Sequence, residues 1–105
     1  MADSTYIAPL GDLSQELLAM QIDQVILYLN QKAGKKYSIS TQSHRIAIST
    51  ILRSGYTIED MYMVVDYKVN EWGDSEKMKS YLTPQTLFAT YRFSDYLIQA
   101  KSNRN

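Results

Sequence analysis

Residues 57–72 read TIEDMYMVVDYKVNEW, and this stretch decides the fold class of the chain. Its apolar side chains recur at steps of three and four residues, which is the spacing of one face of an α-helix. Thr57 followed by Glu59 and Asp60 is a helix-start signal, because a hydroxyl caps free N–H groups and carboxylates oppose the helix dipole. The stretch therefore predicts an amphipathic helix that begins after Thr57 and closes at Gly73. The predicted apolar face holds Ile58, Met61, Tyr62, Val65, Val69 and Trp72.

The sequence on either side repeats the helical pattern with few breaks. Residues 13–33 and 44–52 each carry an apolar face, the first stopped by Gly34 and the second preceded by a Ser/Thr cluster that offers a cap. We expect a short helix within 75–82, then Thr83 as a cap before Pro84. A last helix is predicted from Ser94, with Phe93 placed to contact Ile98. The chain is thus predicted to be all-α, a compact bundle of four to five short helices.

The predicted helices form one domain, over residues 13–101, because 105 residues are enough for a single core. Residues 1–12 have no apolar period and are predicted to be flexible, and residues 102–105 are predicted to fray. The sequence has no cysteine, no apolar run of the roughly 20 residues needed to span a bilayer, and no signal-peptide layout at its N-terminus. These features predict a cytoplasmic protein without membrane contact.

Catalytic and metal-binding templates are missing from the sequence. His44 is the single histidine, so a two-histidine zinc motif is impossible, and no glycine-rich phosphate loop is present. A lone histidine on the apolar edge of a helix is more often a packing or capping residue than a general base. Glu59, Asp66 and Glu71 lack the spacing that converges metal ligands, and Lys68 is within pairing reach of Glu71. We therefore expect a protein that is not an enzyme, with no catalytic residue, metal or cofactor.

The charges come in blocks although they sum to zero at pH 7. Residues 1–23 contain four acids and no base, whereas residues 24–58 contain five bases and no acid. Lysines in a turn beside Tyr37 are suited to neutralise phosphates and stack a base. The alternative is that acidic and basic helices attract each other across the fold, and the sequence does not choose between the two. The candidate nucleic-acid-binding residues are Lys32, Lys35, Lys36, Tyr37, Arg45, Arg53, Lys68 and Trp72.

Several ordered motifs in residues 25–98 resemble one known family. VILYLNQKAGKKY at 25–37 is similar to its opening YLN-x-K-x-GK-x-(F/Y). GYTIED at 55–60 and VVDYKVNEW at 64–72 are similar to its G(F/Y)T-x-ED and VID-x-K-x-x-EW segments. KMKSYLTPQTLF at 77–88 resembles its KM-x-x-YL-x-P-x-TLF segment, and Tyr96-Leu97 its closing YL. The family is the conserved phage C-terminal domain found at the end of phage replisome-organiser proteins.

The resemblance implies a phage or prophage accessory domain in DNA replication, acting in the bacterial host cell. The analogy is to the DnaD-type primosome proteins of Gram-positive bacteria, whose C-terminal helical domains contact DNA and the helicase-loading machinery. It therefore implies a DnaD-C-terminal-like fold and, as partners, single- or double-stranded DNA and the host helicase or its loader. The DnaD-type signature places Tyr, an apolar residue and Trp at steps of four. The chain has Val64, Lys68 and Trp72 there, so only the tryptophan is kept.

Two further departures from the family leave an alternative function open. Ala89 stands where the family usually has glycine, and the winged-helix DNA-binding domain that normally precedes the module is missing from this sequence. We expect either a free-standing gene product or an excised piece. The alternative is a stand-alone protein-interaction module that recruits or inhibits a host replication protein without binding DNA. The sequence predicts no oligomeric state.

Overall fold

The structure is a computed structural model that describes the backbone of residues 2–103 and the side chains of residues 14–103. It contains no strand within residues 2–103, so the prediction of an all-α bundle is confirmed. The elements in chain order are α1 (Ala2–Ala33), α2 (Gln42–Arg53), α3 (Ile58–Trp72), the 3-10 helix η1 (Met78–Tyr81), α4 (Pro84–Leu87) and α5 (Thr90–Ser102).

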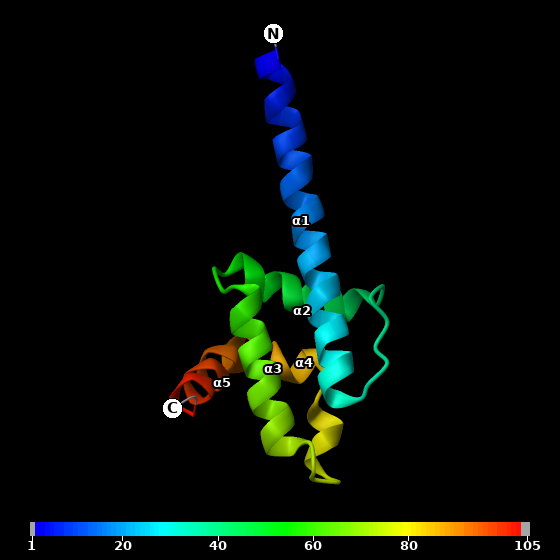
Figure 1. Ribbon diagram of the computed structural model, residues 1–105, viewed down its shortest axis with the longest axis vertical. Helices are drawn as coiled ribbons and strands as arrows, with labels where there is room; N and C mark the ends of the chain where they lie inside the picture. The colour runs from blue at the N-terminus through cyan, green and yellow to red at the C-terminus, as the bar shows by residue number, and fades with distance from the viewer. Residues whose placement is uncertain (1, 104–105) are drawn as a thin grey trace.

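Helix α3 lies at the centre of the bundle and contacts α1 on one side and α5 on the other (Figure 1). Helix α2 packs across α1, and the short α4 fills the space between α2 and α5. The N-terminal half of α1 projects beyond the other helices, so the molecule measures 59 × 30 × 21 Å along its principal axes (Figure 1). None of the helices within residues 2–103 has both the length and the apolar character to cross a membrane.

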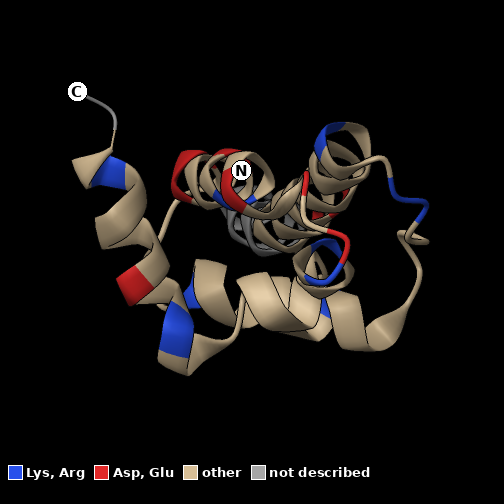
Figure 2. Cartoon of the chain, turned by 90° about the horizontal axis from the view of Figure 1, so that it is seen from below, with Lys and Arg blue, Asp and Glu red and all other residues tan. Residues whose placement is uncertain are grey.

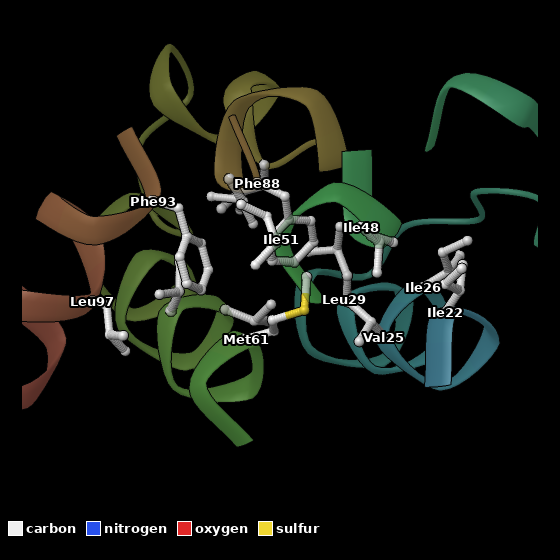
Figure 3. Close-up of a cluster of buried hydrophobic side chains, with 14 residues drawn as sticks. Ile22, Val25, Ile26, Leu29, Ile48, Ile51, Met61, Phe88, Phe93 and Leu97 are labelled. Carbon is white, nitrogen blue, oxygen red and sulfur yellow. The ribbon is translucent and has the colours of Figure 1, made fainter. Parts of the chain in front are cut away.

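One hydrophobic core holds the helices together (Figure 3). All five α-helices contribute to it or end beside its members, whereas η1 has no buried residue. Most of its side chains are completely shielded from solvent, so it provides the main stabilisation of the fold. Its buried members are Ile22, Val25, Ile26 and Leu29 from α1, Ile48 and Ile51 from α2, Met61, Val64 and Val65 from α3, and Leu82, Leu87, Phe88, Phe93 and Leu97 from the C-terminal part.

The helix that decides the fold class forms as predicted. The Thr57 hydroxyl accepts a hydrogen bond from the Asp60 N–H at 3.1 Å, and the Asp60 carboxylate accepts one from the Thr57 N–H at 3.0 Å. This reciprocal capping box satisfies two of the N–H groups that a helix start leaves free. Helix α3 ends at Trp72, with Gly73 as its C-cap.

The start of α1 differs from the prediction. We predicted a flexible segment over residues 1–12 and a helix from residue 13, whereas α1 begins at Ala2. Extending an existing helix adds one hydrogen bond for each residue fixed, so residues 2–12 continue the helix without an apolar period of their own. The predicted boundary is wrong, while the flexibility of residues 2–12 stays a prediction. Met1 lies outside the described residues, as do residues 104–105 of the predicted frayed tail.

Two predicted helix starts need correction, and one is confirmed. Helix α5 begins at Thr90 rather than Ser94, because Phe93 is buried between Tyr56 and Phe88 and does not form a staple with Ile98, which is 62% exposed. No hydroxyl of the Ser/Thr cluster caps α2, whose N-cap Thr41 makes no side-chain bond. The predicted start of α4 is confirmed. Thr83 is its N-cap and accepts a hydrogen bond from the Thr86 N–H, and Pro84 is its first residue.

Candidate nucleic-acid interface

The turn that follows α1 is clamped at its base by one side chain. Asn30 donates a hydrogen bond to the Tyr37 carbonyl oxygen at 2.9 Å and accepts one from the Tyr37 N–H at 2.8 Å. The Lys35 N–H donates to the Asn30 carbonyl oxygen at 3.0 Å. Gly34 adopts a φ of +66°, a left-handed conformation in which glycine carries no steric cost. Lys35 and Lys36 are therefore presented by a fixed turn.

Lysines from two distant segments meet beside this turn. Lys32 and Lys35 line a pocket of about 450 Å³ together with Lys79 of η1, and the one acid among its lining residues is Asp74. Lys36 is exposed on the same turn, whereas Lys79 makes an exposed ion pair with Glu76 at 3.2 Å. We call Lys32, Lys35, Lys36 and Lys79 the lysine cluster.

Lys79 was absent from the predicted set, because its place depends on a contact between segments far apart in the sequence. The Tyr37 hydroxyl donates a hydrogen bond to the Leu82 carbonyl oxygen at 2.9 Å, which ties the chain after η1 to the turn after α1. Nothing in the local sequence around Lys79 signals this return. The bond between Tyr37 and Leu82 could be predicted only from evidence that the Tyr37 side chain packs inside the fold.

Tyr37 makes its contacts within the fold and is not positioned to stack on a nucleic-acid base. Its ring packs edge-on against the His44 ring, with centroids 5.1 Å apart, and burial raises the pKa of its hydroxyl. His44 in turn lies 2.9 Å from the Gln85 amide nitrogen through Nδ1. The prediction that His44 is a packing residue is confirmed, whereas the predicted stacking role of Tyr37 conflicts with these contacts.

Arg45 is also occupied within the molecule. Its guanidinium donates to the Asp23 carboxylate at 2.6 Å and to the Ile39 carbonyl oxygen at 2.5 Å, and the side chain is 22% exposed. These bonds join α1, the loop before α2 and α2 itself. For Arg45 the alternative interpretation of the charge blocks holds, because Asp23 of the acidic residues 1–23 attracts Arg45 of the basic residues 24–58 across the fold.

Lys68 is the clearest correction to the predicted set. Its side chain is buried, with the residue only 4% exposed, and its ammonium pairs with the Glu71 carboxylate at 2.7 Å. The ammonium also lies 4.4 Å from the centre of the Trp72 ring and 4.2 Å from that of Tyr96. The predicted pairing with Glu71 is confirmed. A buried ammonium cannot reach a phosphate, however, so Lys68 leaves the candidate interface.

Trp72 belongs to the same internal cluster. Its ring meets Tyr81 and Tyr96 edge-on, at centroid distances of 6.4 and 6.2 Å, and it packs against the core. Aromatic pairs in this geometry contribute about 1 kcal/mol each beyond the area they bury. Trp72 closes the bundle between α3 and α5 and is not presented to a nucleic acid.

Arg53 is exposed but lies away from the lysine cluster. It lines a pocket with Leu18 of α1, which is fourteen residues, or about 20 Å of helix, from Lys32. Figure 2 shows the wider pattern, in which basic segments are distributed over several elements, with the loop after α1 and helix α5 on opposite sides. The bases of residues 24–58 therefore do not form one face.

Acidic side chains gather at a separate groove of about 510 Å³ beside α3 and α5. Glu59 and Asp66 line it together with Tyr62 and Tyr67. At its edge the Tyr28 hydroxyl donates to Asp66 Oδ1 at 2.7 Å, and the Tyr28 ring stacks on Tyr62 with centroids 4.1 Å apart. Burial, followed by the bond to Asp66, raises the pKa of Tyr28 to about 12.

Comparison with curated proteins finds no match, and comparison with solved structures finds none either. One protein-family model, described as the Conserved phage C-terminus, matches residues 25–98. The matched region contains the complete lysine cluster and all of α2, α3 and α4. It covers more than half of the chain and agrees with the family that the ordered motifs resemble. The chain belongs to the Conserved phage C-terminus family.

Proposed function

We propose that this chain is a non-catalytic accessory domain of phage or prophage DNA replication, and that its lysine cluster contacts the phosphates of DNA. The observation that carries the proposal is the convergence of Lys32, Lys35 and Lys79 on one pocket, with Lys36 exposed beside it. The replication role is supported by the motifs that resemble the end of phage replisome organisers. The non-catalytic role is supported by the packing of His44 against Tyr37 and Gln85.

The chemistry of the cluster favours contacts to the DNA backbone over reading of the bases. Lysine ammoniums act as point charges that neutralise phosphates without sequence preference. The aromatic rings that a base could stack on are engaged elsewhere, Tyr37 with His44 and Trp72 with Tyr96. The C-terminal ends of α1 and α3 also lie at this pocket, and their negative partial charge offsets part of the lysine field. We therefore expect weak, non-specific binding with a Kd of about 10 to 100 µM.

Fluorescence anisotropy with labelled single- and double-stranded oligonucleotides, titrated over a range of salt concentrations, tests the DNA contact. Neutralising three or four phosphates predicts that log Kd changes by about 3 for each tenfold change in salt. The Lys35→Glu/Lys36→Glu variant should abolish binding at low salt. Lys101→Glu on α5 is the matched control and should bind within about twofold of the unaltered protein. No binding at low salt, or binding that the double variant leaves unchanged, would refute the proposal.

A second candidate function is the protein-interaction module, which one observation favours. Five of the eight predicted DNA-contacting residues make internal contacts, including Lys32, whose ammonium lies 5.4 Å from the centre of the Tyr28 ring. Large apolar side chains of α1 and α2 are exposed, in contrast, among them Leu27 and Ile46. Exposed apolar side chains at a helix pair suit a protein partner better than a phosphate backbone. Affinity capture from host lysate followed by mass spectrometry should recover the host helicase or its loader. Recovery of neither would count against this function.

A further inference from the structure

Three members of the lysine cluster surround a concave pocket. Lys32 and Lys35 line it from the end of α1 and the turn that follows, and Lys79 lines it from η1. Val69 and Leu82 form part of its apolar lining. Its volume of about 450 Å³ is typical of ligand pockets, which measure roughly 300 to 1,000 Å³. We call this cavity the lysine pocket.

The lysines of the pocket keep their positive charge available to an anion. Among residues 14–103, neither Lys32 nor Lys35 forms an ion pair with an acid. The Lys32 ammonium lies 5.4 Å from the centre of the Tyr28 ring, a contact that leaves its charge in place. Lys79 pairs with Glu76 at 3.2 Å, but both side chains are exposed, and such a surface pair is weak enough for a bound anion to displace.

The balance of charge at the lysine pocket is positive, and its backbone is fixed. The lining contains three ammonium groups and one carboxylate, that of Asp74. The C-terminal ends of α1 and α3 add about half a negative charge each, which leaves an excess of about one positive charge. The Tyr37 hydroxyl bond to the Leu82 carbonyl oxygen joins the two segments that carry the lysines. The site therefore exists before a ligand arrives, and binding loses less free energy to ordering.

A terminal phosphate of DNA suits such a pocket better than an internal one. An internal phosphodiester carries one negative charge and has a sugar on each side, and both sugars hinder its entry into a concave site. A terminal phosphate is joined to the strand by one ester bond, carries a charge of about −1.5 to −2 at pH 7 and has three acceptor oxygens. The oxygens equal the pocket ammoniums in number, and the larger charge is attracted more strongly.

We propose that the lysine pocket binds the terminal phosphate of a DNA strand. The proposal rests on the DNA contact proposed above and specifies which phosphate Lys32, Lys35 and Lys79 neutralise. Lys36 is exposed on the same turn but does not line the pocket, and it contacts an internal phosphate of the same strand. The described lining contains no aromatic side chain, so the end is recognised without regard to its base.

Fluorescence anisotropy with three single strands of one sequence, each labelled at an internal position, tests the proposal. One strand carries a 5′-phosphate, one a 3′-phosphate, and one has hydroxyl groups at both ends. A phosphorylated strand should bind about threefold to tenfold more tightly than the hydroxyl strand, because it adds a group that accepts charge-assisted hydrogen bonds. Equal binding of all three strands overturns the proposal and leaves the DNA contact intact. If no strand binds, the DNA contact is refuted as well.

Thymidine 5′-monophosphate distinguishes a DNA end from a free nucleotide, which carries the same phosphate group. It should displace the phosphorylated strand only at concentrations at least about tenfold above the Kd of that strand, because it has no second phosphate for Lys36. A nucleotide that binds as tightly as the strand would make the lysine pocket a nucleotide site and overturn its assignment to DNA ends.

Variants inside and outside the lysine pocket locate the preference for a phosphorylated end. Lys79→Gln should remove most of this preference, because it deletes one of the three ammoniums that line the pocket. Lys36→Gln removes an equal charge beside the pocket and is the matched control, so it should weaken all three strands alike. Asp74→Asn should increase the preference by about twofold, because it removes the carboxylate of the lining. A preference that Lys36→Gln lowers as much as Lys79→Gln does, or that Asp74→Asn lowers, overturns the proposal.

Discussion

Lys68 sits where α3 faces α5, and the aliphatic part of its side chain fills space that a purely apolar residue would otherwise occupy. The Glu71 carboxylate balances its charge from the solvent side, while the faces of Trp72 and Tyr96 enclose the ammonium. Removing the charge therefore differs from removing its partner. Without the charge the desolvation cost disappears, whereas without Glu71 the buried ammonium loses its ion pair.

We predict that Glu71→Gln lowers the free energy of unfolding by about 2 kcal/mol, because it leaves the Lys68 ammonium without a carboxylate partner. Lys68→Met keeps the length of the side chain and should cost about 1 kcal/mol or less. Urea denaturation followed by circular dichroism measures both variants. Glu76→Gln provides the control, because its exposed ion pair with Lys79 should contribute little. A greater loss in Lys68→Met than in Glu71→Gln would contradict the account.

Tyr28 gives the molecule a predictable response to alkaline pH. Its pKa is raised from 10.0 to about 12, first by burial and then by the hydrogen bond to Asp66. The folded state thus holds the phenolic proton more tightly than the unfolded chain does. This contribution to stability is complete below pH 10, and it is lost as the pH rises from about 10 through about 12.

The urea midpoint of the unaltered chain should therefore fall between pH 9 and pH 11, and Tyr28→Phe should reduce that fall. Asp66→Asn should have an intermediate effect, because it removes the carboxylate while burial remains. Tyr91→Phe, at an exposed position of α5, should follow the unaltered chain. An identical alkaline loss in Tyr28→Phe and the unaltered chain would disprove the role of this hydroxyl.

At the scale of elements, helix starts differ in how they are secured. Thr57 caps α3 through its hydroxyl, whereas Thr41 occupies the same position at α2 without a side-chain bond. We predict that Thr57→Ala lowers the free energy of unfolding by about 1 kcal/mol and that Thr41→Ala lowers it by a few tenths at most. Urea denaturation of the two variants, a matched pair of threonine N-caps, decides the matter. Equal losses would show that the capping box contributes nothing beyond helix propensity.

The same elements show what local sequence can predict. Helix α3 was predicted to within one residue because its apolar period, its capping residues and its closing Gly73 all agree. The start of α5 was misplaced because Phe93 carries a local staple signal, yet its burial against Tyr56 and Phe88 is decided by the tertiary fold. Local capping rules describe a helix in isolation, and they fail where long-range packing contributes more.

The candidate site was less predictable than the fold, for a related physical reason. From the sequence alone, a basic residue is equally consistent with a place in a solvated turn, in an ion pair or in the buried interior. Only the packing of the helices distinguishes these three environments. Lys35 is in a turn, Arg45 is in an ion pair and Lys68 is buried. The addition of Lys79 and the loss of Lys68 both follow from contacts between segments more than 25 residues apart.

At the scale of the whole molecule, the described core assigns different roles to the two halves of α1. Leu18 is the first core-packed residue within residues 14–103, and Ile22 is the first fully buried one. The C-terminal half of α1 therefore stabilises the bundle. The backbone of the N-terminal half projects beyond the bundle (Figure 1). Truncations of the two halves should consequently differ in their effect on stability.

We predict that removing residues 1–13 changes the free energy of unfolding by less than about 0.5 kcal/mol, because the described core begins at Leu18. Removing residues 1–24 should instead cost more than about 3 kcal/mol, because it deletes Ile22 from the core and Asp23 from its bond with Arg45. Urea denaturation of the two truncated chains measures both effects. If the shorter truncation destabilised the bundle as much as the longer one, the N-terminal half of α1 would be part of the folded core and not an extension from it.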